Sequence, residues 1–419
     1  MPPCREPVVL DDVAAFDGAQ SVFRPLFARI ANGTLARERE RKLPFAEVSW
    51  LKKQRFGALR VPVAFGGYGL DHESFLRLLI ELAEADPNIA HLFRGHFALV
   101  EEKLCAPEGN ERSIWLERFG RGEIAGNAST EPGETRLGRK STRLRMGDGG
   151  WLLSGTKFYT TGSIFAEWID VSATRGDDES VFVLVPRHHA GVEIIDDWDG
   201  FGQRLTGTGT AIFKDVPVEG HAVTPRTGRL PYLGAVYQAV LLAALAGIAR
   251  SIAGETASLL QLRSRVYSHG NTPLAKDDPQ LKQIVGELAA TAFGAEAVLL
   301  ATAKGFADAQ IAARSGDGER ARAAAQLLEL EINKVQILIA DLVPRAATRL
   351  FDALGASAVR QEHGLDRHWR NARVILSHNP VVYRARIVGD HVVNRKLPDL
   401  AWSVGVVDPA SIDRGIDGA

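Results

Sequence analysis

Two short segments combine amides, hydroxyls and aromatic rings in a way that suits a flat ligand with a polar edge. The first reads GNASTEPG, from Gly126 to Gly133, and the second reads WLLSGTKFYTTG, from Trp151 to Gly162. A flavin ring needs hydrogen bonds at N1, O2, O4 and N5, and an aromatic side chain can pack on its face. Taken singly, the first segment is equally a capped turn and the second a β-hairpin.

The elements that position these segments follow from hydrophobic spacing. From about Val8 to Phe119 the pattern is mostly helical, as in the three- and four-residue spacing from Phe75 to Ala83, and Asp86-Pro87 should end that helix. Between about Gly122 and Pro231 short strand-like runs are separated by glycine, proline and aspartate turns. These runs are 151–154, 157–161, 168–173, 181–185, 192–195 and 210–216. Their close spacing favours an antiparallel barrel or sandwich.

Long helices rich in alanine and leucine return after Pro231, as a tightly packed bundle requires. An apolar stripe along one of them is formed by Leu328, Ile332, Val335, Ile339 and Leu342, and Pro344 should bend or end that helix. The sequence therefore predicts an α+β protein with a helical domain at 1–121, a central β-domain at 122–231 and a helical bundle at 232–419.

Composition restricts the classes of function. The 419 residues are 45% hydrophobic, and 50 basic against 51 acidic residues leave a net charge of −1, which gives no global field for nucleic acid or an anionic membrane. Cys4 and Cys105 fit neither a disulfide framework nor a metal site, so we expect no metal. The chain starts without a secretory pattern, and its longest apolar run, 239–249, is shorter than the roughly 20 residues of a membrane span. We expect a cytoplasmic protein.

The two opening segments, about thirty residues apart, resemble the TEPG turn and the WxLNGxKxWIT strand of the acyl-CoA dehydrogenase family. The resemblance covers nearly the whole chain, because that family has a helical amino-terminal domain, a central antiparallel β-domain and a carboxy-terminal four-helix bundle. Arg265, Tyr267, Gln280 and Gln283 look like the segment that contacts the flavin phosphate from a neighbouring subunit. The resemblance thus implies a flavin site shared between subunits of a homotetramer.

The chain departs from the dehydrogenases near its carboxy terminus. Where many of them carry a catalytic glutamate in a YEGT-like segment, this chain reads LDRHWRNARVILSHNP, with His378 in place of the carboxylate. That stretch and DWDGFGQRLTGTGT, residues 197–210, resemble the dibenzothiophene monooxygenase branch. The resemblance implies an enzyme that receives reduced FMN from a separate NAD(P)H:flavin reductase and activates O2 as a C4a-(hydro)peroxyflavin. The lack of a GxGxxG dinucleotide motif agrees with a separate reductase.

The resemblance also suggests a role for individual residues. It places His378 near the flavin C4a, His96 across the substrate pocket, Thr161 at N5 and Asn127 at the flavin edge. The other residues that it assigns to the cofactor are Ser129, Thr130, Tyr159, Thr160 and Arg265, and Trp198 joins Tyr159 as an aromatic wall. Histidine suits the handling of one proton, because its ordinary pKa is about 6.5. A second histidine that the branch sometimes carries three residues before His378 is replaced by Ile375.

Three functions follow from these residues. The leading one is oxygenation of a small apolar substrate, such as an organosulfur compound, at sulfur, nitrogen or a ring carbon. The second is an FAD-dependent acyl-CoA dehydrogenase whose base lies elsewhere, for instance at Glu255. The third is a non-catalytic flavin-binding scaffold.

Overall fold

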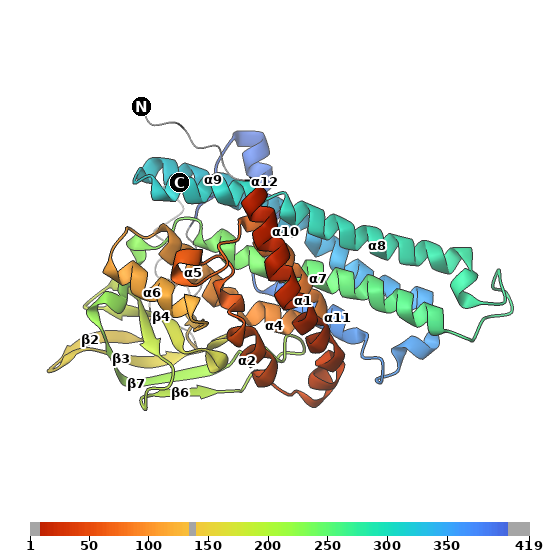
Figure 1. The fold of residues 1–419 in the computed structure, drawn as a ribbon, viewed down its shortest axis with the longest axis horizontal. Coiled ribbons are helices and arrows are strands. Elements are labelled where there is room, and N and C mark those ends of the chain that lie inside the picture. The colour runs from red at the N-terminus through yellow and green to blue at the C-terminus, as the bar shows by residue number, and fades with distance from the viewer. Residues whose placement is uncertain (1–8, 134–139, 401–419) are drawn as a thin grey trace, which may run out of the picture.

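The computed structural model describes residues 9–133 and 140–400, and its amino-terminal part is helical (Figure 1). The helices are α1 (Val9–Glu40), α2 (Phe45–Lys53), α3 (His72–Ala85), α4 (Pro87–Leu92), α5 (Arg94–Cys105) and α6 (Asn110–Gly120), with short 3-10 turns η1 (Phe56–Ala58) and η2 (Val63–Phe65). As predicted, Asp86 ends α3, and its side chain accepts a hydrogen bond from the Asn88 backbone and so caps α4. Cys4 lies outside the described residues.

The middle of the chain forms one sheet in the order β6-β7-β3-β2-β4-β5-β8, with β1 paired to β4. The strands are β1 (Ala125–Ala128), β2 (Arg143–Gly147), β3 (Gly150–Lys157), β4 (Trp168–Arg175), β5 (Glu179–Pro186), β6 (Val192–Ile195), β7 (Thr210–Val218) and β8 (Val223–Pro225). Most pairings are antiparallel, as expected, but β4 pairs in parallel with both β1 and β2. The strand expected at 157–161 was wrong, because β3 ends at Lys157 and Tyr159 takes a positive φ of 60°.

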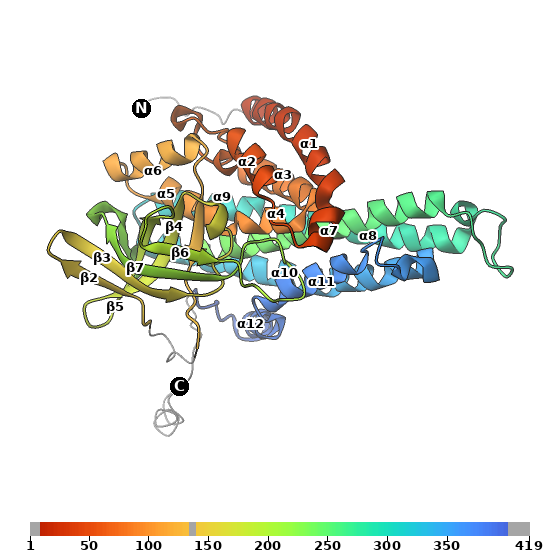
Figure 2. The same cartoon turned by 90° about the horizontal axis from the view of Figure 1, so that it is seen from below.

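Helices return after the sheet, and the longest of them extend away from it (Figures 1 and 2). They are α7 (Leu233–Leu262), α8 (Pro279–Leu300), α9 (Ala303–Arg314), α10 (Gly318–Leu354), α11 (Asp366–Ser377) and α12 (Val381–Asn394). The stripe from Leu328 to Ile339 is buried in α10 as predicted, and Leu342 is partly buried, but the helix continues through Pro344 for ten residues. Burial of Val343, Ala346, Ala347 and Leu350 explains why this proline does not end the helix.

Two hydrophobic cores meet at α5. Phe97 and Ala98 pack in the larger core, which α1, α3, α7, α8 and α10 build, while Leu99, Val100 and Leu104 pack with α6 and one face of the sheet. The same helix therefore fixes the bundle against the sheet. Residues at the start of α5 and at the end of α4 consequently lie where the three parts of the chain join.

Within residues 9–133 and 140–400, two helical segments are long and apolar enough to cross a membrane by length and composition. In α7 the apolar window is 83% buried inside the protein, which identifies it as a core helix, whereas in the segment 279–314 only 28% is buried. The exposed side chains of that segment include Phe293 and Ile311. An apolar face of this size is available for contact with another protein surface.

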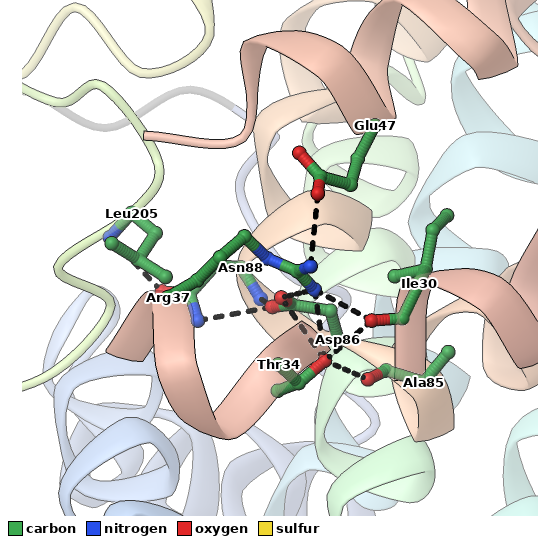
Figure 3. A network of polar contacts seen from close by, with 8 residues as sticks. All are labelled: Ile30, Thr34, Arg37, Glu47, Ala85, Asp86, Asn88 and Leu205. Carbon is green, nitrogen blue, oxygen red and sulfur yellow. Dashed lines mark hydrogen bonds and ion pairs between the residues drawn. The ribbon is translucent and has the colours of Figure 1, made fainter. Parts of the chain in front are cut away.

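A buried polar network joins α1 to the α3–α4 junction (Figure 3). The Arg37 guanidinium lies 2.8 Å from an Asp86 carboxylate oxygen and 3.0 Å from Glu47. Thr34 donates to the Ala85 carbonyl at 2.7 Å, and Asp86 also accepts from the Asn88 side chain at 3.1 Å. Because Asp86 is fully buried, its charge depends on Arg37.

We predict that Arg37→Met lowers the free energy of unfolding by about 3–5 kcal/mol, because it leaves the Asp86 carboxylate buried without a cation. Urea unfolding measured by circular dichroism checks the value. Arg24→Met removes an ion pair with Glu81 whose arginine is 58% exposed, and should cost less than about 1 kcal/mol. Equal losses in the two variants would contradict the role assigned to Arg37.

Candidate active site

A buried ion pair holds the first of the two opening segments against the second. Glu131 accepts hydrogen bonds from Lys157 Nζ at 2.7 Å, from the Ser141 backbone at 2.6 Å and from the Thr142 backbone at 2.9 Å. Burial alone would raise the pKa of Glu131, but these hydrogen bonds outweigh it and lower the pKa to about 2. The carboxylate is therefore charged and structural, and it fixes the turn that carries Ser129 and Thr130.

The residues after Lys157 leave the sheet, and each of them contacts a different part of the protein. Phe158 donates its backbone N–H to the Thr130 carbonyl at 2.9 Å, which joins the two motifs directly. Tyr159 is 47% exposed, and its ring meets Trp198 edge-on with centroids 5.9 Å apart. The expected pair of aromatic walls is thus brought together. Thr160 is fully buried and donates to the Gly209 carbonyl at 2.9 Å, so its hydroxyl is used within the protein.

A line of hydroxyls runs from Thr161 towards the helical domain. Thr161 Oγ1 lies 2.7 Å from Thr208 Oγ1, which lies 2.8 Å from Thr206 Oγ1, and Thr206 donates to the Gln203 carbonyl at 3.0 Å. The Gln203 side chain in turn accepts from His91 Nδ1 at 2.9 Å. The loop that the sequence singled out at 197–210 therefore links the β-domain residue Thr161 to a histidine on α4.

His91 has the free ring nitrogen that a proton-handling group needs. It is 6% exposed, and Nε2 has no hydrogen-bond partner among residues 9–133 and 140–400. Because Nδ1–H donates to Gln203, Nε2 carries a lone pair and can accept a proton. Burial lowers the pKa of His91 to about 4, with a smaller contribution from Arg94, so the ring is neutral at neutral pH.

His378 follows α11 and lies close enough to His91 for their charges to interact. It is exposed in the single chain, yet desolvation first, and then the charges of Arg94 and His91, hold its pKa well below 6.5. The next residue, Asn379, is fixed by a 2.6 Å hydrogen bond to Gln238 on α7.

His96, which we expected across the pocket from His378, is used elsewhere. Its Nε2 donates to the Gly57 carbonyl at 2.9 Å, and its Nδ1 accepts from the Ala125 backbone at 3.2 Å. Neither nitrogen is free, the ring is fully buried, and burial lowers its pKa to about 4. The geometry does not support a proton-handling role for His96; its imidazole instead ties α5 to η1 and to β1.

His91 is the residue that the sequence reasoning missed. It precedes His96 by five residues, but it lies on α4 whereas His96 lies on α5, so the two side chains have different surroundings. The available signal was its place one turn after the Asp86-Pro87 helix start, which aims the last residues of α4 at the loop around Gln203. Without the hydrogen bond to that loop, the sequence offers no reason to prefer His91.

Polar atoms without a hydrogen-bond partner lie around this junction. Their chemistry can be compared with what the edge of a flavin ring requires. Within the described part of the chain, Asn127 Oδ1, Gln203 Nε2 and Asn379 Oδ1 are buried without a hydrogen-bond partner, as is His91 Nε2. A Cβ at Gly95 would lie 2.9 Å from Asn127 Oδ1, so α5 approaches β1 closely at this point. Acceptors and donors of this kind match the N–H and carbonyl groups of a flavin edge. Among the described residues, no group of histidine, cysteine and carboxylate side chains could hold a metal ion.

Arg265 lies far from this junction within one chain. It follows α7, and the residue that bonds Asn379, Gln238, stands near the start of that helix, about 35 Å away along its axis. Arg265 is exposed. Its predicted contact with flavin phosphate can therefore be made only in the site of another subunit.

Comparison with known proteins agrees with this geometry. A model of the acyl-CoA dehydrogenase C-terminal domain matches residues 239–383, and a model of the acyl-CoA dehydrogenase middle domain matches residues 126–216. Together they cover more than half of the chain. The chain belongs to the acyl-CoA dehydrogenase superfamily.

Full-length relatives narrow the family to its monooxygenase branch. A dibenzothiophene monooxygenase of Rhodococcus qingshengii is 26% identical, over 92% of this chain and 95% of its own length. A probable FMNH2-dependent monooxygenase, SfnC of Pseudomonas putida, is 27% identical over 91% and 96%. The crystal structure of FMN-bound TdsC from Paenibacillus sp. A11-2 aligns with a TM-score of 0.83 and 26% identity, over 93% of this chain and 99% of that chain. The predicted fold and family are confirmed.

The base suggested for a dehydrogenase, Glu255, is engaged elsewhere. Its carboxylate pairs with Arg367 and accepts from His368 Nε2 at 3.2 Å. Burial opposes ionisation, but the hydrogen bond from His368 and the two neighbouring charges lower the pKa of Glu255 to about 2. A carboxylate held in this way is a weak base, and it lies more than four helical turns beyond Gln238 on α7.

We predict that acid destabilises the protein first through its buried neutral histidines. The pKa of His96 is about 4 in the folded chain against about 6.5 unfolded, so the unfolded chain binds more protons between these values. The stability that His96 contributes is complete above pH 6.5 and is lost as the pH falls to 4, by up to about 3 kcal/mol. Melting temperatures from pH 7.5 to 4 should fall less steeply in His96→Gln than in wild type. His188→Gln, at an exposed histidine, should keep the wild-type slope.

Proposed function

We propose that the chain is a flavin-dependent monooxygenase that receives reduced FMN from a separate reductase in the cytoplasm and transfers one oxygen atom of O2 to a small substrate. The observation that supports this most strongly is a pair of neutral imidazoles, His91 and His378, at the junction where a dehydrogenase would need a carboxylate. When bound there, reduced FMN supplies the two electrons that activate O2.

Residues of the β-domain would hold the flavin ring. Asn127 Oδ1 can accept from a ring N–H, and the hydroxyl pair of Thr161 and Thr208 can donate to a ring acceptor. Tyr159 and Trp198 would pack on the flat part of the ring or the substrate. The Glu131–Lys157 ion pair keeps both motifs in place without entering the chemistry.

The two histidines differ in what they can do with a proton. The lone pair on His91 Nε2 accepts one, and the proton on Nδ1 is shared with Gln203, which holds the ring in this tautomer. The side chain of His378 is exposed to solvent, so a substrate can reach it. Their low pKa values keep both rings neutral, so either can take up a proton transiently and return it.

The decisive experiment measures oxygenation directly. Purified protein is supplied with FMNH2 and 18O2, and a panel of sulfides, sulfones and aromatic amines is examined by mass spectrometry for products that contain one 18O atom. As the competing test, acyl-CoA thioesters are added under anaerobic conditions to protein loaded with oxidised FAD. Bleaching of the flavin by a thioester, with no 18O product from any substrate, would favour the dehydrogenase instead.

We predict that His91→Ala and His378→Ala each lower kcat/KM for oxygenation by roughly a hundredfold or more, the usual contribution of a positioned proton-transfer group. FMNH2 binding, followed by anaerobic titration, should remain close to wild type. His96→Gln should retain most of the oxygenation activity, because His96 bonds only to backbone groups. If His96→Gln is as inactive as His91→Ala while both proteins stay folded, the assignment of His91 is wrong.

We further propose that the site is completed in a homotetramer. The weakly buried apolar face of 279–314 gives the surface for such assembly, and Arg265 reaches a flavin phosphate only across subunits. An arginine suits this role because its guanidinium forms paired, charge-assisted hydrogen bonds with phosphate.

We predict that Arg265→Met weakens FMN binding by roughly tenfold or more, while Arg322→Met, at an exposed arginine on α10, does not. Quenching of FMN fluorescence gives both dissociation constants, and sedimentation velocity gives the oligomeric state. A monomer that binds FMN as tightly as the oligomer would contradict the shared site.

A further inference from the structure

Arg94 is the first residue of α5 and stands three residues after His91, at the same junction. Its Nε donates to the Tyr237 carbonyl at 3.2 Å, and its guanidinium lies 4.4 Å from the centre of the Tyr237 ring. These contacts fix the stem of the side chain against α7. They leave the terminal nitrogens of the guanidinium without a protein acceptor among the described residues.

Four arginines whose side chains are at most 9% exposed each have a carboxylate partner. Arg37 pairs with Asp86, Arg60 with Glu101, Arg229 with Glu102 and Asp170, and Arg367 with Glu255. In the part of the chain that the structure describes, no aspartate or glutamate lies within ion-pair distance of Arg94. Burial of this cation lowers its pKa to about 10, which still leaves it charged at neutral pH. An uncompensated, partly buried cation is costly unless a ligand supplies the anion.

Arg94 belongs to the same junction as His91 and His378. Tyr237, which holds Arg94, is followed on α7 by Gln238, which holds Asn379 beside His378. The buried, unpartnered Nε2 of His91 and Oδ1 of Asn379 belong to the same junction. Arg94 also acts electrostatically on both His91 and His378. The junction therefore carries one positive charge close to two neutral imidazoles.

We propose that Arg94 binds an anionic group of the substrate, of the size of a sulfinate or carboxylate, and that the enzyme selects anionic over neutral substrates. The inference rests on the proposed function and makes its substrate class more specific. The same charge could instead face an anionic part of the flavin. The substrate is favoured because Arg94 stands with the histidines on the helical side, whereas Thr161 and Thr208 mark a flavin edge on the β-domain.

A binding experiment that needs no turnover tests this directly. Protein saturated with oxidised FMN is titrated with benzenesulfinate and, separately, with methyl phenyl sulfone, a neutral compound of similar size, by calorimetry. Wild type should bind the sulfinate at least tenfold more tightly. Arg94→Met should weaken sulfinate binding by roughly tenfold to a hundredfold, the loss expected for a charge-assisted hydrogen bond, and leave sulfone binding unchanged. Arg94→Lys should restore part of the preference.

Arg29→Met is the matched control, because Arg29 also stacks on an aromatic ring, Trp50, but on α1 outside the pocket. It should keep the wild-type preference. Equal affinity of wild type for sulfinate and sulfone would overturn the proposal, whether or not the variants fold. A loss of FMN affinity in Arg94→Met with sulfinate binding intact would assign the arginine to the flavin. A preserved sulfinate preference, with no 18O product from the sulfinate or from any other substrate, would refute the proposed function alone.

Discussion

The site depends on one buried carboxylate, that of Asp86. Its negative charge is balanced by Arg37 from α1, and its oxygens cap the start of α4, so the direction of that short helix is fixed at its first turn. The capped residue Asn88 then accepts from the Leu205 backbone at 3.2 Å, which anchors the loop that carries Gln203, Thr206 and Thr208 (Figure 3). A single ionic contact thereby positions both His91 and the residues that hydrogen-bond to it.

The order of elements could be predicted from the sequence, because periodicity of three to four residues and alternating strands are local properties. The exceptions are places where tertiary contacts decided the local structure. Tyr159 leaves the strand pattern since its backbone turns to bring Thr160 and Thr161 against the 206–209 loop. Pro344 fails to end α10 because the buried face of that helix continues on both sides of it. Such effects depend on residues far away in the chain.

The distinction between local and long-range signals also decides which residues of the site could be predicted. Asn127, Tyr159, Thr161 and Trp198 could be proposed from the sequence because they belong to motifs whose spacing is visible. The structure brings Tyr159 and Trp198 together and places Thr161 against Thr208. His91 was missed because its importance comes from Gln203, 112 residues away. His96 looked equally suitable, and only the occupation of both its nitrogens by Gly57 and Ala125 separates the two histidines.

Charge explains why an imidazole suits the position of His378 better than a carboxylate. Arg94 lies near this position, and a glutamate there would become its ion-pair partner, with a pKa held well below the ordinary value. Such a group would be a weak base and would also cancel the positive charge of the pocket. An imidazole beside the same arginine stays neutral, keeps a nitrogen lone pair, and leaves the guanidinium free for an external anion. We therefore infer that the histidine at this position and the arginine without a carboxylate partner belong to one electrostatic arrangement.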